Sequence, residues 1–121
     1  MKFLNLPIFL LFLSGCTTGH LKYMTPEGEM MIACKTEYSG SPNVDKYAVE
    51  YILSHCAKQA VQNGNTVVDK KLLNLALTVP EPPEGQKWSF ELATALHKKG
   101  SLSDKQYGYL IAYIDLGHNK D

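Results

Sequence analysis

The chain of 121 residues contains no arginine, so its 12 basic side chains are all lysines. Its 12 acidic residues balance them, and the formal net charge at neutral pH is zero. Arginine is the residue best suited to a bidentate grip on phosphate or carboxylate. Because arginine, a basic block and an excess of positive charge are all missing, we expect no nucleic acid among the partners.

The motifs of common catalytic and metal sites are missing too. The sequence has no Gly-rich phosphate loop, no G-x-S-x-G, no H-E-x-x-H and no C-x-x-C. None of its four histidines has a second histidine four residues away, so we predict no metal and no cofactor. Cys56 follows His55, but neighbours on a helix diverge by about 100° and cannot act together on one substrate atom. The sequence therefore predicts a protein that is not an enzyme.

An apolar run near the N-terminus is the most informative stretch that is present. Lys2 precedes residues 3–13, which are apolar except for Asn5 and Pro7. A run of about 11 residues suits the hydrophobic region of a secretory signal and is too short to span a bilayer. The run ends in Leu13-Ser14-Gly15-Cys16.

This stretch resembles the lipobox of bacterial prolipoproteins. The resemblance implies that residues 1–15 are a signal peptide that is removed, and that Cys16 carries diacylglycerol and an acyl chain such as palmitate. Two or more chains hold a protein firmly on a membrane. Thr17 stands where an Asp would commonly signal inner-membrane retention, which favours the outer membrane without excluding the inner one. The protein would then face the periplasm or the cell surface.

With Cys16 lipidated, two of the three cysteines remain. Cys34 and Cys56 form an even pair in an oxidising compartment, so we predict a disulfide, with two free buried thiols as the alternative. Closing this loop would stabilise the fold by about 3 kcal/mol.

The residues after Cys16 have the composition of a linker. The polar residues of 17–29, together with Pro26 and Gly28, give this stretch no period, so we predict a flexible tether over residues 16–29. Residues 30–38 alternate in polarity and predict a strand with Ile32 and Cys34 on one inward face.

Local signals predict three helices and two further strands. Ser41 and Pro42 begin an amphipathic helix that runs to residue 63, and its apolar arc includes Cys56. Residues 66–68 predict a short strand, and the alternation of residues 73–79 predicts a longer one. A helix capped by Ser89 and a helix with the capping box Ser103–Gln106 then predict a helical hairpin over residues 89–117.

The spacing of Leu92, Leu96 and Gly100, followed by the residues from Ser101 to Tyr107, is similar to the SHOCT motif. That motif is a short helical hairpin near bacterial C-termini, and the resemblance implies association without catalytic residues. The chain departs from it after Tyr107, where Gly108 and apolar residues replace the usual charged continuation.

The last predicted helix is apolar on two faces. One stripe contains Tyr107, Leu110, Ile111 and Ile114, and the opposite stripe contains Tyr109, Tyr113 and Leu116. Such a helix is either packed on both sides or offers one face to a partner. Both possibilities stay open, the second stripe being the possible interface.

The elements together predict a small single-domain α+β fold. We expect one amphipathic helix on two or three short strands, then the helical hairpin, with the domain over residues 30–117 and a tail over 118–121. The predicted function is that of a non-catalytic outer-membrane lipoprotein that interacts with, or assembles, an unidentified envelope protein. The alternatives are a small cell-wall enzyme and a membrane-tethered carrier of a ligand or metal.

Overall fold

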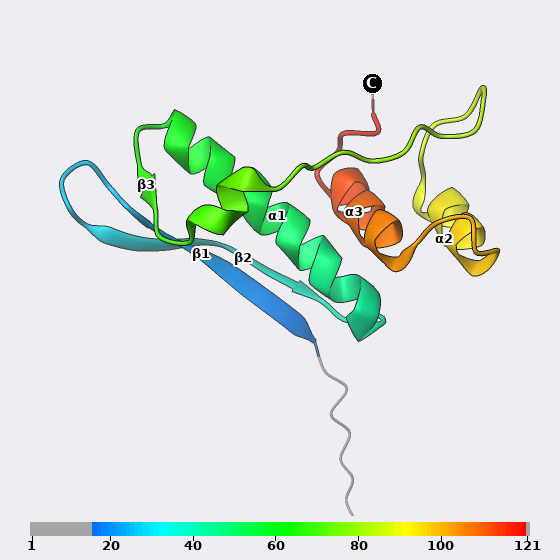
Figure 1. Cartoon of the computed structure of the whole chain (residues 1–121), viewed down its shortest axis with the longest axis horizontal. Helices are drawn as coiled ribbons and strands as arrows, with labels where there is room; N and C mark the ends of the chain where they lie inside the picture. Colours follow the sequence, from blue (N-terminus) through cyan, green and yellow to red (C-terminus); the bar gives the residue numbers. More distant parts are fainter. Residues whose placement is uncertain (1–15, 121) are drawn as a thin grey trace, which may run out of the picture.

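The computed structural model describes residues 16–120, so the predicted signal peptide lies outside the described residues (Figure 1). The elements are strands and helices in the order β1 Thr17–Met24, β2 Met30–Tyr38, α1 Pro42–Gln62, β3 Thr66–Val67, the 3-10 helix η1 Lys70–Asn74, α2 Phe90–Lys98 and α3 Asp104–Asp115.

The elements follow one another across the molecule as sheet, α1, α3 and α2 (Figure 1). Each contact between neighbours has its own group of buried residues. Leu21, Ala57 and Val67 lie between the sheet and α1, Ala48 and Tyr109 between α1 and α3, and Trp88 with Leu110 in the group that joins α2 to α3. The predicted α+β fold is confirmed.

The sheet begins earlier than predicted, and the prediction of a flexible tether was wrong for residues 17–24, which form β1. The strand order is β2-β1-β3, all antiparallel, and β1 pairs with β2 from Thr17 to Met24. Leu21 is buried beneath α1, so burial of apolar surface fixes this stretch in place. The Pro and Gly that suggested a linker belong to the hairpin turn at residues 25–29, where Gly28 has a positive φ of 88°.

Because of a β-bulge in β2, the prediction that Ile32 and Cys34 share one inward face was wrong. Thr36 lies opposite Gly19 and Ala33 opposite Leu21, so β2 has two residues where β1 has one. The extra residue shifts the alternation, and Cys34 faces α1 while Ile32 is 53% exposed. Cys34 takes the left-handed conformation there, with a φ of 54°.

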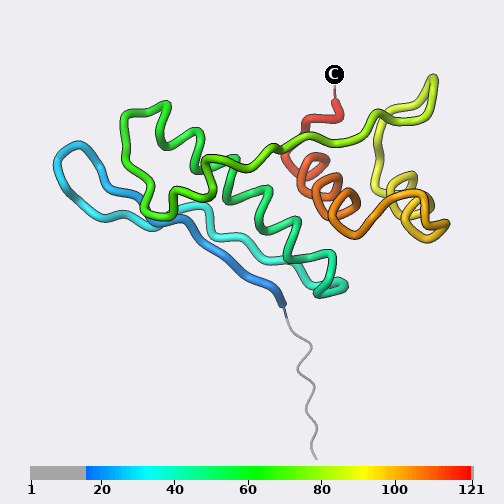
Figure 2. Tube along the Cα trace, viewed as in Figure 1, coloured from blue at the N-terminus to red at the C-terminus, as the bar shows by residue number. Residues whose placement is uncertain are grey.

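The predicted strand over residues 73–79 is not a strand. Residues 70–74 form η1, and residues 75–80 then run extended across the molecule without pairing (Figure 2). The predicted alternation nevertheless holds, because Leu77 and Val79 pack on the core while Ala76 and Thr78 are exposed. A strand also needs a neighbour, and no strand lies beside this stretch within residues 16–120.

The helices are confirmed close to their predicted ends. Pro42 lies at the start of α1, Ser89 accepts a hydrogen bond from the Leu92 N–H, and the Ser103–Gln106 capping box is complete.

Candidate functional site

A groove of about 560 Å³ lies between residues 76–80 and the first half of α3. We call it the α3 groove. Its walls combine extended backbone with polar and aromatic side chains, namely Ala76, Thr78, Val79, Pro80, Ser103, Lys105, Gln106 and Tyr109.

Two side chains hold the ends of the extended wall. Lys58 Nζ on α1 donates to the carbonyl oxygen of Leu75 at 2.6 Å, and Trp88 Nε1 donates to that of Pro80 at 2.8 Å. Between them, residues 76–79 make no backbone–backbone hydrogen bond with any residue from 16 to 120. This wall is therefore a short extended edge, fixed at both ends and open to pairing in the middle.

The helical wall is rigid and carries one positive charge. The side chains of Ser103 and Gln106 form the two hydrogen bonds of the capping box. Lys105 is exposed, and its Nζ lies 5.4 Å from the centre of the Tyr109 ring. The lysine is thus the charged group of the groove that remains open to solvent.

Tyr109 belongs to the core. It is 2% exposed, its ring lies edge-on to Tyr51, and its hydroxyl donates to Glu50 Oε1 at 3.2 Å. Burial, and then the neighbouring Glu50 carboxylate, raise the pKa of Tyr109 to about 12. Its hydroxyl therefore stays neutral and bonded at ordinary pH, which suits a structural role.

The other two residues of the possible interface are half-buried. Leu116 and Tyr113 both pack against the α1–α3 core, and the Tyr113 ring also contacts His118 with 5.4 Å between ring centres. Leu110 and Ile114 on the opposite stripe pack toward α2. The helix is thus packed on both sides, which favours ordinary packing of this stripe, and an interface at Tyr109, Tyr113 and Leu116 stays a prediction.

The predicted tail also contacts the domain. His118 lies against His55 with 5.5 Å between ring centres, and Asn119 Nδ2 donates to the Trp88 carbonyl oxygen at 2.8 Å. Burial, followed by the charges of His118 and Lys58, lowers the pKa of His55.

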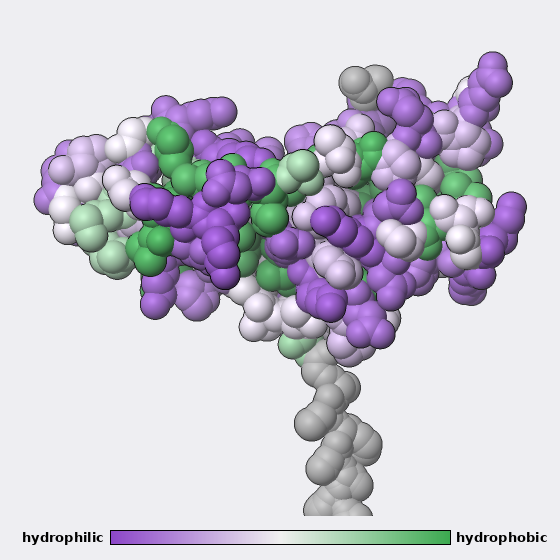
Figure 3. Space-filling model, in the orientation of Figure 1, coloured by the Kyte–Doolittle hydropathy of each residue, from purple (hydrophilic) through white to green (hydrophobic). Residues whose placement is uncertain are grey.

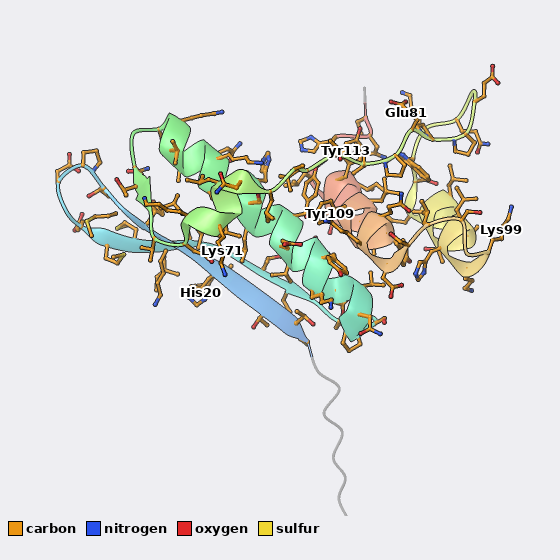
Figure 4. All side chains as sticks on the ribbon, viewed as in Figure 1. His20, Lys71, Glu81, Lys99, Tyr109 and Tyr113 are labelled. Atoms are coloured by element: carbon orange, nitrogen blue, oxygen red, sulfur yellow. A yellow bond between two sulfur atoms is a disulfide. The ribbon has the colours of Figure 1, made fainter. Side chains whose placement is uncertain are left out.

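The cysteines and histidines do not form a reactive group. Cys34 and Cys56 are joined by the predicted disulfide, which removes the thiol next to His55. His97 bonds Asp104 at 2.8 Å, and His20 lies on the side of β1 that faces away from α1 (Figure 4). Within residues 16–120, no three His, Cys, Asp or Glu side chains come close enough to hold a metal ion.

Cys16 is exposed and lies directly before β1. The pairing of Thr17 with Tyr38 places Cys16 beside the end of β2. The Glu37 side chain there raises the pKa of the Cys16 thiol, first through a hydrogen bond. No helix in residues 16–120 is long and apolar enough to cross a bilayer.

No family model, curated protein or solved structure matches the chain. The α3 groove could not be found from the sequence, because it joins residues that are more than 20 positions apart.

Proposed function

We propose that the protein is a lipid-anchored lipoprotein of the bacterial envelope, placed on the outer membrane, that binds a partner protein without catalysis. The lipobox before Cys16 and the exposure of Cys16 at the start of β1 support the anchor. The Cys34–Cys56 disulfide supports export, because disulfides persist in oxidising compartments.

The α3 groove is the observation that carries the binding function. An extended polypeptide laid beside residues 76–79 would pair with their free backbone groups, as in strand addition to a sheet edge. The ends of this edge are already fixed by Lys58 and Trp88, so little order remains to be gained on binding. Lys105 favours a partner segment that carries an acidic side chain.

The anchor is tested by the mass of the mature protein purified from membranes. We expect a polypeptide that begins at Cys16 and carries diacylglycerol and an acyl chain. Cys16→Ser should leave an unlipidated precursor, and its fold should persist because Cys16 is exposed and takes no part in the disulfide. Recovery of a normally processed mature protein from this variant would contradict the anchor.

The groove is tested by a photo-crosslinking residue at the exposed position Ala76, with a matched probe at the exposed Glu91 on α2. In cells, the probe at position 76 should trap an extended, acidic segment of one envelope protein. Thr78→Pro removes a backbone donor, and one lost hydrogen bond of about 1 kcal/mol should reduce trapping about fivefold. Thr78→Ala keeps the donor and should trap normally.

Equal trapping from both probes, or no effect of the proline, would contradict the role of the groove.

A further inference from the structure

The sheet has one bare face and one face that the helices cover, except at the hairpin end, where Met31 on the helix side is 39% exposed. Every helix lies on the α1 side of the β1–β2 hairpin (Figure 1). The side chains that point the other way are all exposed; we call them the outer sheet face, and they are Thr18, His20, Lys22, Met24, Met30, Ile32, Lys35 and Glu37.

The outer sheet face is apolar at its hairpin end. Met24, Met30 and Ile32 are 38%, 50% and 53% exposed, and hydrophobic surface is visible at this end of the molecule in Figure 3. Met24 pairs with Met30 across the strands, and Ile32 pairs with Lys22 one step further along. Exposed large apolar side chains that gather in this way mark a surface that is covered in the working protein.

The middle of the face is basic and hollowed. Lys22 and Lys35 project from neighbouring strands, and a depression of about 330 Å³ at the bulge is lined by His20, Lys35 and Glu37 among others. Lysines beside apolar residues suit a lipid surface, because their stems lie along the apolar part while the ammonium groups reach the phosphates. Glu37 lies toward the Cys16 end, and Glu27 and Glu29 belong to the turn.

The position of the proposed anchor, directly before β1, indicates what covers the outer sheet face. Because β1 starts at Thr17, no flexible tether separates Cys16 from the sheet. The 8 residues of β1 span about 26 Å. Cys16 and the apolar end of the outer sheet face therefore lie at opposite ends of one strand. Lipid chains on Cys16 would hold the whole face within reach of the bilayer.

We propose that the outer sheet face lies flat on the lipid surface to which Cys16 is anchored, an inference that rests on the proposed lipidation. Met24, Met30 and Ile32 enter the boundary between head groups and acyl chains, and Lys22 and Lys35 meet the phosphates. Three side chains alone would hold a free protein weakly, but the anchor makes their insertion intramolecular. The α3 groove lies on the other side of α1 from the sheet.

The test uses the mature lipidated protein in vesicles of phosphatidylethanolamine and phosphatidylglycerol with brominated acyl chains. Ile32→Trp places a fluorophore on the outer sheet face, and Val61→Trp places one on α1 at a site that is also exposed, by 45%. The one native tryptophan, Trp88, is 4% exposed and contributes equally to both samples. We expect bromine to quench the Ile32→Trp emission by about half and to leave that of Val61→Trp almost unchanged.

Equal quenching of the two variants would overturn the flat orientation. Protection of Ile32→Trp from an aqueous quencher without bromine quenching would also overturn it, and would show that a second copy of the chain covers the face. The mass of each sample reports lipidation separately. A lipidated protein with equal quenching refutes only the orientation, whereas a protein without lipid refutes the anchor and the orientation together.

Discussion

At the scale of single residues, Gly108 sets how closely α3 approaches α1. A Cβ at this position would lie 2.6 Å from the Val44 carbonyl oxygen and 2.7 Å from the Tyr47 Cβ. In an exposed helix, alanine is favoured over glycine by about 1 kcal/mol. Here the clash with backbone should outweigh that gain, so we predict that Gly108→Ala lowers the free energy of unfolding by about 1–3 kcal/mol.

Urea unfolding of the oxidised protein measures this loss. Gln59→Ala is the control, because it changes an exposed residue of α1 and should alter the unfolding free energy by less than about 0.5 kcal/mol. Wild-type stability of Gly108→Ala would show that the two helices do not meet at this glycine.

At the scale of elements, the helices could be predicted because their signals are local. Pro42, Ser89 and Ser103 each mark a helix start through geometry within one turn of chain, and the structure places all three as expected. The disulfide was predictable because the lipobox resemblance assigned Cys16 to lipid and so left two cysteines to pair.

The strands at residues 30–38 and 66–68 are confirmed, but the predictions for residues 17–24 and 73–79 were wrong because a strand depends on what lies beside it. Residues 17–24 carry a partial alternation through Leu21 and Tyr23, yet the prolines and glycines that followed favoured a linker. Residues 75–80 show the clearer alternation and have no strand to pair with. The same absence of pairing leaves the edge of the α3 groove open, so the failed prediction and the candidate site have one cause.

Hydrogen exchange distinguishes these two stretches. The paired amides of β1 should exchange slowly, and those of residues 76–79 should exchange near the rate of an unstructured peptide because no backbone acceptor holds them. Exchange is followed residue by residue on the oxidised protein by NMR. Fast exchange throughout residues 19–24 would support the prediction of a flexible tether. Slow exchange at residues 76–79 would show that this edge is already paired.

At the scale of the whole molecule, α1 joins the two halves of the fold. It packs on the sheet with one side and on α3 with the other, and its Cys56 binds covalently to β2. The C-terminal residues return to the same helix, where His118 lies against His55, and Asn119 bonds the Trp88 carbonyl. The free energy of unfolding should therefore respond to a proton at His55.

The direction of that response follows from the lowered pKa of His55. Burial disfavours the imidazolium most, and the charges of His118 on the C-terminal segment and Lys58 on α1 add to it. The unfolded chain titrates near 6.5 at this site, so below that pH it binds more protons than the folded protein. The stability that neutral His55 contributes is thus fully present above pH 6.5 and decreases as the pH falls toward the folded-state pKa.

Urea unfolding between about pH 7.5 and 5.5 should show this loss in the wild type and a smaller loss in His55→Gln. His118→Gln removes one of the two charges and should give an intermediate slope. A His118→Gln curve that coincides with the wild type while His55→Gln differs would mean that the C-terminal segment does not rest against α1, and parallel curves for all three proteins would mean that His55 has no lowered pKa.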